Sequence, residues 1–439
     1  MWLILSVIKI KSISCIDYLL IILVILNTTT TGNKSRAERL DSELKNMERS
    51  IVHCDLDTFF VSVERLQNSK LIGVPVLIGG NSDRGVVASC SYEARKFGVH
   101  AAMPMRLALR MCPEAIVVRG DHDMYSQYSS IVTQIIEEET PIVEKASIDE
   151  HYLDVSGMDR FFGCWKWTQE LRQRIIKQTG LPISFGLSVN KTVSKIATGT
   201  AKPCGEKQVQ GGSEKGFLAP LSIRKIPMVG EKSFTLLRNM GISKIGTLQQ
   251  MEVFTMQKVL GENGINIWRK ANGLDDSLVV PFREQKSMSK ENTFQQDTID
   301  MDVLRRTLIS MVDTLAFDLR KDQKLTSCVT LKIRYSNFDT HTQQLQVGYT
   351  NSDRKLTEVV LSLFKKLYSR RMLIRLIGIK FSGLIYGSYQ TDLFDDSAEE
   401  VNLMQAMDKI RKRYGAEFLM KGICAPLPEK GGEHALKST

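Results

Sequence analysis

Two short apolar segments that end on acidic residues are the feature that most constrains the fold of this sequence. Residues 51–57 predict a β-strand that ends on Asp55 and Asp57. Residues 142–155 predict two short strands that meet at an acidic turn containing Asp149 and Glu150. The two groups of acids are far apart in the chain, so they converge at one sheet edge only if their strands are neighbours.

Carboxylates gathered at one sheet edge suit divalent metal ions, because hard cations prefer oxygen ligands. Two Mg²⁺ ions about 3.5–4 Å apart can make a 3′ hydroxyl nucleophilic and pyrophosphate a good leaving group. The alternative is that Asp55, Asp149 and Glu150 are surface acids at turns, which is the commoner situation for any single aspartate.

Composition narrows the class of protein. A chain of 439 residues is too long for one compact core and predicts two to four domains. The 59 lysines and arginines exceed the 49 aspartates and glutamates, and this surplus favours an anionic partner such as nucleic acid. The eight cysteines occur singly, without a C-x-x-C pair or a zinc-like spacing. They are typical of a reducing cytosol, so we expect a cytoplasmic protein.

The first 46 residues do not fit this composition. Residues 16–26 are apolar except for Asp17, which makes a run about the length of a signal-peptide core but short for a membrane span. An upstream stretch translated from a misassigned start, a weak membrane anchor and a true signal are all open. We favour the first because Met47 immediately precedes the first predicted strand, and we expect no membrane association.

Two motifs give the sequence a family resemblance. Residues 55–64, DLDTFFVSVE, resemble the D-x-D-x-F-F/Y-x-x-V-E motif of Y-family DNA polymerases. Residues 147–154, SIDEHYLD, resemble their S-x-D-E-x-Y-L-D motif. Further blocks typical of the family lie at residues 88–99, 103–104, 185–191, 195–197 and 201–203. The resemblance covers residues 50–395 and is to the bacterial DNA polymerase IV type.

The resemblance implies an α+β multidomain fold shaped as a right hand. Its parts would be a palm (51–58 and 122–210), fingers (59–121), a helix-hairpin-helix thumb (211–280), a linker (281–286), an α+β little finger (287–387) and a tail (388–439). The sequence pattern itself predicts a separate α+β module after residue 289. Its order is strand 289–293, helix 301–321, strands 327–335 and 342–347, helix 355–368 and strand 374–385.

The family resemblance also implies roles for single residues. Asp55, Asp149 and Glu150 would bind two Mg²⁺ ions with the Leu56 carbonyl, and Glu150 would help to activate the primer hydroxyl through its metal. The triphosphate would be held by Tyr92, Arg95, Lys202 and backbone N–H groups near Phe59 and Phe60. Guanidinium and ammonium groups suit phosphate, although tyrosine and arginine three residues apart on a helix often only pack and solvate one face.

Phe60 would be the steric gate of such an enzyme. A ring against C2′ of the incoming sugar leaves no room for a hydroxyl, so deoxynucleotides are selected by exclusion. Without the resemblance, Phe59 and Phe60 are an aromatic pair of the kind usually found in a core. In strand or turn geometry one ring would face the core and the other the site.

The expected DNA contacts lie later in the chain. The hairpin at residues 227–230 would offer backbone N–H groups to a DNA phosphate through Gly230 and Lys232, with a plain helical-hairpin core as the alternative. Related hairpins usually carry glycine at the position of Met228. A side chain at this position affects how closely the backbone can approach DNA. Charge and strand position also suggest phosphate contacts for Lys290, Lys332 and Arg334 in the little finger.

Residues 390–394, QTDLF, resemble the Q-x-x-L-F peptide that binds the bacterial sliding clamp. Leu393 and Phe394 would fill an apolar pocket while Gln390 makes polar contacts. About 45 residues follow, whereas such peptides often end the chain. Among these, Met404, Met407 and Ile410 are spaced for one face of a packing or partner helix.

The sequence therefore predicts a template-directed DNA polymerase that performs low-fidelity translesion synthesis in damage tolerance. No motif of a 3′ to 5′ proofreading nuclease is present. The expected partners are primer-template DNA, deoxynucleoside triphosphates and the sliding clamp, with the chain itself a monomer. One alternative is a relative of the polymerase V catalytic subunit. Another is an inactive DNA- and clamp-binding adaptor, which the intact Asp55, Asp149 and Glu150 argue against.

Overall fold

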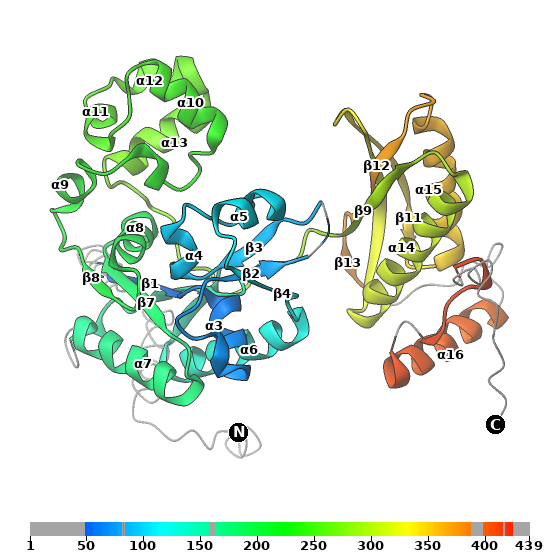
Figure 1. Cartoon of the computed structure of the whole chain (residues 1–439), viewed down its shortest axis with the longest axis horizontal. Coiled ribbons are helices and arrows are strands. Elements are labelled where there is room, and N and C mark those ends of the chain that lie inside the picture. Colours follow the sequence, from blue (N-terminus) through cyan, green and yellow to red (C-terminus); the bar gives the residue numbers. More distant parts are fainter. Residues whose placement is uncertain are drawn as a thin grey trace, which may run out of the picture. The chain divides into compact units, whose positions relative to one another are not determined.

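The computed structural model describes residues 49–80, 82, 84–158, 163–387, 398–415 and 418–424 (Figure 1). The chain divides into two compact units: unit 1 lies within residues 1–81 and 85–282, and unit 2 within residues 82–84 and 283–439. The leader at 1–46 and the clamp motif at 390–394 fall outside the described residues, so both stay predictions. Within the described ranges, no helix is long and apolar enough to cross a membrane.

A five-stranded sheet organises unit 1, with the strand order β5-β6-β1-β7-β8. Its strands are β1 (Ile51–Leu56), β5 (Ile142–Lys145), β6 (Glu150–Asp154), β7 (Ile183–Ser188) and β8 (Glu206–Gln208). The helices beside it are α6 (His122–Glu139), α7 (Cys164–Thr179) and α8 (Lys191–Ala201). Strand β1 pairs antiparallel with both β6 and β7, so the first acidic strand lies at the centre of the sheet.

Alternation along β1 gives the sheet two different faces. Val52, Cys54 and Leu56 pack in the apolar core that α6 and α7 cover. His53 and Asp55 point to the other face, where α8 lies. This helix approaches β7 closely because Gly186 has no side chain: a Cβ there would lie 2.4 Å from a backbone oxygen of α8. Polar side chains of β1 are thereby held against α8.

A smaller three-stranded sheet in unit 1 has the order β3-β2-β4. It consists of β2 (Val76–Gly79), β3 (Val87–Cys90) and β4 (Ile116–Val118), with helices α3 (Phe59–Gln67), α4 (Tyr92–Lys96) and α5 (Met105–Met111). Phe59 and Val63 of α3 pack in the core of the large sheet, while Val61 packs in the core of the small one. Helix α3 therefore ties the two sheets together.

Short helices make up the last part of unit 1. They are α9 (Glu214–Leu218), α10 (Glu231–Asn239), α11 (Ile245–Gln249), α12 (Val253–Leu260) and α13 (Glu262–Ala271). Their shared core includes Val193 and Ile196 from α8. Met228, just before α10, has a φ of +81°, a conformation that a side chain makes costly and that glycine adopts freely. The chain thus keeps a glycine-like turn at the position where methionine replaces the usual glycine.

Unit 2 contains a five-stranded antiparallel sheet, in which four strands have the order β11-β10-β12-β9 and the fifth lies off this path. Its strands are β9 (Ser287–Thr298), β10 (Lys324–Tyr335), β11 (Thr340–Thr350) and β12 (Ile374–Ser382), and the short β13 (Ile385–Tyr386) pairs with β10. Helices α14 (Met301–Lys321) and α15 (Asp353–Leu367) share the apolar core with one face of this sheet. The element order predicted for this module is confirmed, with β9 longer than expected.

Helix α16 (Ala398–Tyr414) is bound to the rest of unit 2 by charged groups. Arg320 of α14 donates to Asp408 of α16 at 2.6 Å and to Asp353 of α15 at 2.7 Å. Arg411, almost fully buried, donates to Asp313 of α14 at 2.5 Å. Met404 and Met407 are half-buried, and Ile410 of the same expected face is exposed. Helix α16 therefore packs against the rest of unit 2 as expected, but mainly through ion pairs.

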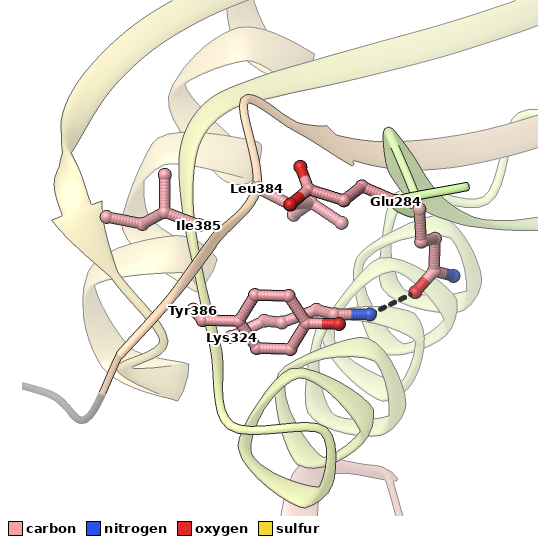
Figure 2. Close-up of a pocket in the computed structure, with 6 residues that line it drawn as sticks. Glu284, Lys324, Leu384, Ile385 and Tyr386 are labelled. Atoms are coloured by element: carbon pink, nitrogen blue, oxygen red, sulfur yellow. Dashed lines mark hydrogen bonds between the residues drawn. The ribbon is translucent and has the colours of Figure 1, made fainter. Parts of the chain in front are cut away.

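A cavity of about 160 Å³ lies in unit 2 where the chain enters β9 and leaves β13 (Figure 2). It is lined by Glu284, Gln285, Lys324, Leu384, Ile385 and Tyr386. Lys324 donates to Gln285 Oε1 at 2.6 Å and lies over the Tyr386 ring. The acids with predicted catalytic roles belong to unit 1, and none of them is among the residues that line this cavity.

Candidate active site

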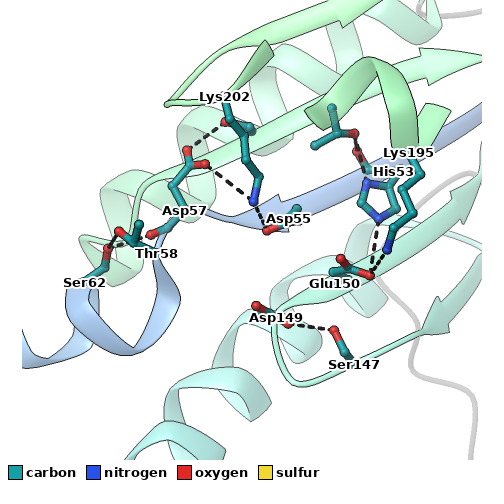
Figure 3. Close-up of polar contacts among 12 residues, drawn as sticks. His53, Asp55, Asp57, Thr58, Ser62, Ser147, Asp149, Glu150, Lys195 and Lys202 are labelled. Carbon is teal, nitrogen blue, oxygen red and sulfur yellow. Dashed lines mark hydrogen bonds and ion pairs between the residues drawn. The ribbon is translucent and has the colours of Figure 1, made fainter. Parts of the chain in front are cut away.

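Strand pairing brings the predicted acids together (Figure 3). In the β1–β6 pair the Cα partner of Asp55 is Glu150. Asp149 occupies the turn just before β6, and its backbone oxygen accepts a hydrogen bond from the Leu56 N–H at 3.0 Å. Ser147 Oγ donates to the Asp149 carboxylate at 2.7 Å. The condition set by the sequence, that the two acidic strands be neighbours, is therefore met.

Lys202 neutralises the first of these acids. It caps the C-terminal end of α8 and forms an ion pair with Asp55. Burial, together with the charges of Glu150 and Asp149, nevertheless raises the pKa of Asp55 to about 6, against the opposing effect of Lys202. Lys202 therefore offsets only part of the cost of burying the charged Asp55 carboxylate.

Glu150 lies in a different environment. Lys195, two turns before Lys202 on α8, donates to Glu150 Oε2 at 2.5 Å, and His53 Nε2 lies 3.7 Å from the same oxygen. Burial by itself would raise the pKa of Glu150, but His53 and Lys195 lower that pKa to about 2. The His53 ring is buried, and Thr198 of α8 fixes its Nδ1 at 2.9 Å.

The acids have the right chemistry for Mg²⁺. Asp55, Asp149 and Glu150 offer only oxygen ligands, and they lie at neighbouring strand ends where negative charge is in excess. In the described part of the chain, however, no three His, Cys, Asp or Glu side chains are grouped so as to hold a metal ion. Asp55 and Glu150 instead contact lysines, so a bound cation would have to take the place of these ammonium groups.

Tyr92 lies at the start of the short helix α4, and Arg95 lies in its last turn. The Arg95 guanidinium stands over the Tyr92 ring, 4.9 Å from its centroid. The Tyr92 hydroxyl donates to Asp57 Oδ1 at 3.1 Å, and burial raises the pKa of Tyr92. Through Asp57, which follows β1, this helix is linked to the strand that carries Asp55.

Phe59 and Phe60 form the first turn of α3, not a strand or a turn, which corrects the expected geometry. Consecutive helix positions diverge by about 100°, so Phe59 enters the core while Phe60 stays partly exposed. The Phe60 ring stacks on Tyr125 at 4.3 Å and meets the His122 ring edge-on at 5.8 Å. Thr58, with a φ of +43°, starts the helix, and the N–H groups of a first turn are free to bind anions.

The predicted DNA-binding residues of unit 1 lie at another helix start. Gly230 is the N-cap of α10, and Lys232 is exposed in its first turn. Met228, two residues before this cap, is exposed and contacts Lys270 through its sulfur at 3.5 Å. The Gly230 N–H donates to the Met228 carbonyl at 3.2 Å, so the exposed Lys232 and the N–H groups of the first turn of α10 are what this helix start offers to a phosphate.

The three basic residues suggested for unit 2 do not share one face. Lys332 and Arg334 alternate with buried residues of β10, so they lie on the sheet face opposite the helices. Lys290 pairs across the sheet with the core residue Ile379, and its ammonium donates to Thr314 of α14 at 3.3 Å. This separation follows from strand register, which charge alone does not indicate.

Sequence reasoning missed three polar residues of the site. The sequence pattern identifies Asp57 only as a second acid at the strand end, Lys195 only as part of a family block, and His53 only as a strand residue. A signal for Lys195 existed, because Lys195, Thr198 and Lys202 are spaced for one face of α8. His53 shares the strand face of Asp55 by alternation.

Two family models and several named relatives match the chain. The model of the impB/mucB/samB family matches residues 54–199, and that of the family's C-terminal domain matches residues 285–393. The DNA polymerase IV of Dehalococcoides mccartyi is 36% identical over 378 residues, which cover 85% of this chain and 97% of the relative. That of Listeria monocytogenes is 35% identical over 339 residues, with 76% and 95% covered.

The fold has a solved counterpart. A Y-family DNA polymerase chimera of Dbh and Dpo4 superimposes with a TM-score of 0.68 at 24% identity, covering 77% of this chain and all of the chimera. The chain belongs to the impB/mucB/samB family. It is a DNA-directed DNA polymerase with the Y-family fold, so the predicted family and fold class are confirmed.

Proposed function

We propose that the chain adds deoxynucleotides to a primer 3′ end by two-metal phosphoryl transfer, directed by a template strand. The observation that carries this proposal is the β1–β6 register, which sets Asp55 opposite Glu150 with Asp149 beside it. Two bound Mg²⁺ ions would supply a more nucleophilic hydroxyl and charge neutralisation on the phosphates. Asp55, Asp149 and Glu150 would hold them, together with the Leu56 carbonyl.

The triphosphate would lie between α3, α4 and the end of α8. Arg95 offers a planar guanidinium and Lys202 a compact charge, while Tyr92 supports Arg95 from below its plane. The N–H groups of Phe59 and Phe60, at the start of α3, have no partner in the helix itself and would bind phosphate oxygens. Lys202 would exchange its contact with Asp55 for one with the nucleotide.

Sugar selection is assigned to Phe60. Stacking on Tyr125 fixes the orientation of its ring, and a fixed ring excludes a 2′ hydroxyl more reliably than a mobile one. Phe59, buried in the core, supports the helix that presents Phe60.

The wider role is low-fidelity synthesis past damaged templates, without proofreading, in DNA repair and damage tolerance. Similarity to proteins named DNA polymerase IV supports it. Primer-template DNA would be gripped through Gly230 and Lys232 and through basic residues of unit 2. Gln390, Leu393 and Phe394 would bind the sliding clamp, and the chain would act as a cytoplasmic monomer.

Primer extension by the purified protein tests this proposal. Undamaged and lesion-bearing templates are compared, with and without Mg²⁺, with each deoxynucleotide supplied in turn. Template-dependent addition that requires Mg²⁺ is expected, with bypass of at least one lesion. Absence of incorporation on every template would contradict the proposed activity.

A further inference from the structure

Asp57 is the most completely enclosed acid beside the candidate site. It is 1% exposed, although it is only two residues from Asp55. Its Oδ1 accepts from the Tyr92 hydroxyl at 3.1 Å and lies 3.8 Å from the Lys202 ammonium. Its Oδ2 accepts from Ser184 Oγ at 2.7 Å and from the Cys204 N–H at 2.6 Å.

These contacts occupy the hydrogen-bonding positions of the Asp57 carboxylate. An ionised carboxylate has about four lone-pair directions, and three hydrogen bonds and a nearby ammonium occupy them. A metal ion at Asp57 would have to displace buried donors, whereas Asp55 only has to release Lys202. The second acid of the D-x-D motif therefore has a different role from the first.

The donors to Asp57 come from segments that carry the proposed phosphate-binding groups. Tyr92 opens α4, the helix of Arg95. Cys204 lies two residues after Lys202, in the turn that follows α8. Ser184 of β7 completes the link, because its oxygen also accepts from the Gly205 N–H at 3.1 Å. Figure 3 shows Asp57 and Asp55 on either side of the Lys202 side chain.

We infer that Asp57 is a positioning residue that orders the triphosphate-binding side of the site and does not bind metal. It fixes the turn at residues 202–205 against β7 through Ser184 and Cys204, and it fixes α4 against β1 through Tyr92. Nucleotide affinity then depends on Asp57, whereas metal use depends on Asp55, Asp149 and Glu150. This inference rests on the proposed polymerase activity.

The test is a double-mutant cycle on Asp57→Asn and Ser184→Ala, two residues that touch neither nucleotide nor metal in the proposed site. Single-nucleotide incorporation gives kcat and KM for the deoxynucleotide. Asp57→Asn is expected to raise KM about tenfold or more, as for a lost hydrogen bond to a charged group. Ser184→Ala should raise KM several-fold, and the double variant should be no worse than Asp57→Asn alone, because both act through one link.

Two further readouts separate positioning from other roles. The Mg²⁺ concentration for half-maximal activity should be unchanged in Asp57→Asn, whereas a metal ligand would shift it. Asp154→Asn is the matched control, since Asp154 is also bonded to a serine hydroxyl, at 2.6 Å from Ser156, but lies at the other end of β6. Its KM should equal that of the unaltered chain.

Three results would overturn the inference: additive effects in the cycle, a shifted Mg²⁺ requirement, or a fall in kcat with unchanged KM. If Asp57→Asn does not fold, Ser184→Ala decides alone, and an unchanged KM in that variant overturns it. Failure of the unaltered chain to incorporate nucleotides would instead reject the proposed activity, so the two failures are distinguishable.

Discussion

Carboxylate–cation contacts at the candidate site of unit 1 differ from those that join the helices of unit 2. At the candidate site the cations are lysines: Lys202 with Asp55, and Lys195 with Glu150. In unit 2 an arginine joins the helices, since Arg320 contacts both Asp353 and Asp408. An arginine fork makes several directed hydrogen bonds, whereas lysine is a single point charge on a flexible stem.

The number of partners of each cation differs between the two regions. Arg320 also donates to the Asn351 carbonyl at 2.8 Å, so its guanidinium is fixed to three partners and suits a permanent joint. Lys202 and Lys195 each bind one carboxylate of the candidate site through one atom and stay partly exposed. A lysine with a single partner can release its carboxylate to a metal ion and bind a phosphate instead.

The largest effect is expected for the acids of unit 1. Asp149→Ala or Glu150→Ala should reduce nucleotide incorporation by at least about a thousandfold, because groups that act as one catalytic unit are not replaceable. DNA affinity should stay nearly the same, since grip depends on phosphate contacts elsewhere. Extension rates and DNA titrations measure both. Asp154→Ala, on the same strand, is the control, and comparable rates in all variants would sink the metal assignment.

Loss of the Arg320 ion pairs in unit 2 should lower stability and leave nucleotide incorporation unchanged. Arg320→Ala leaves Asp353 and Asp408 without their shared cation, and breaking a buried ion pair costs about 3–5 kcal/mol. Hydrogen exchange should show weakened protection of α16 and α14, while incorporation of a single nucleotide on a short primer is unchanged. Arg370→Ala, which breaks an exposed pair with Asp339, should cost at most about 1 kcal/mol. Equal effects of the two variants would show that α16 is not held by Arg320.

A third prediction compares nucleotide addition with clamp binding through the motif at residues 390–394. Replacing Leu393 and Phe394 with alanine should leave distributive synthesis unchanged, because neither residue belongs to the site of unit 1. Clamp affinity should fall several hundredfold, since two apolar anchors lose about 2 kcal/mol or more each. Thr391→Ala, inside the same motif, is the control. Unaltered affinity in the double variant, measured by titration with the clamp of the same organism, would mean that the motif match is accidental.

Motif order predicted the family and the fold class, and the acidic strand ends of Asp55 and Glu150 lie on neighbouring strands as the predicted site requires. Other features depend on tertiary contacts that no local pattern encodes. Asp57 and Asp55 have the same residue type and neighbouring positions, yet only the Asp57 carboxylate accepts hydrogen bonds from Ser184 Oγ and the Cys204 N–H. Helical position, not strand alternation, separates Phe59 from Phe60, since α3 starts directly after Thr58.

Phe60→Ala tests the difference between Phe60 and the core residue Phe59 in unit 1. Removing the ring removes the clash with a 2′ hydroxyl but leaves the acids in place, so deoxynucleotide activity should be partly kept. The ratio of deoxynucleotide to ribonucleotide incorporation efficiency should fall about ten- to a hundredfold. Phe59→Leu, a change in the core, should lower stability without altering this ratio. An unchanged ratio in Phe60→Ala would place the gate at another residue.

The smallest effect concerns the two faces of the sheet in unit 2. Lys332 lies on the face opposite the helices, paired with Glu291 at 2.8 Å, and an exposed pair of this kind contributes at most about 1 kcal/mol to stability. Lys332→Ala should therefore fold normally but lose one phosphate contact, lowering the slope of log affinity against log salt by about 1. Lys290→Ala is the matched variant, because its ammonium points to Thr314 on the helix side, and its salt slope should change less. DNA titrations at several salt concentrations measure both slopes, and a larger change for Lys290 would show that DNA meets unit 2 on the other face.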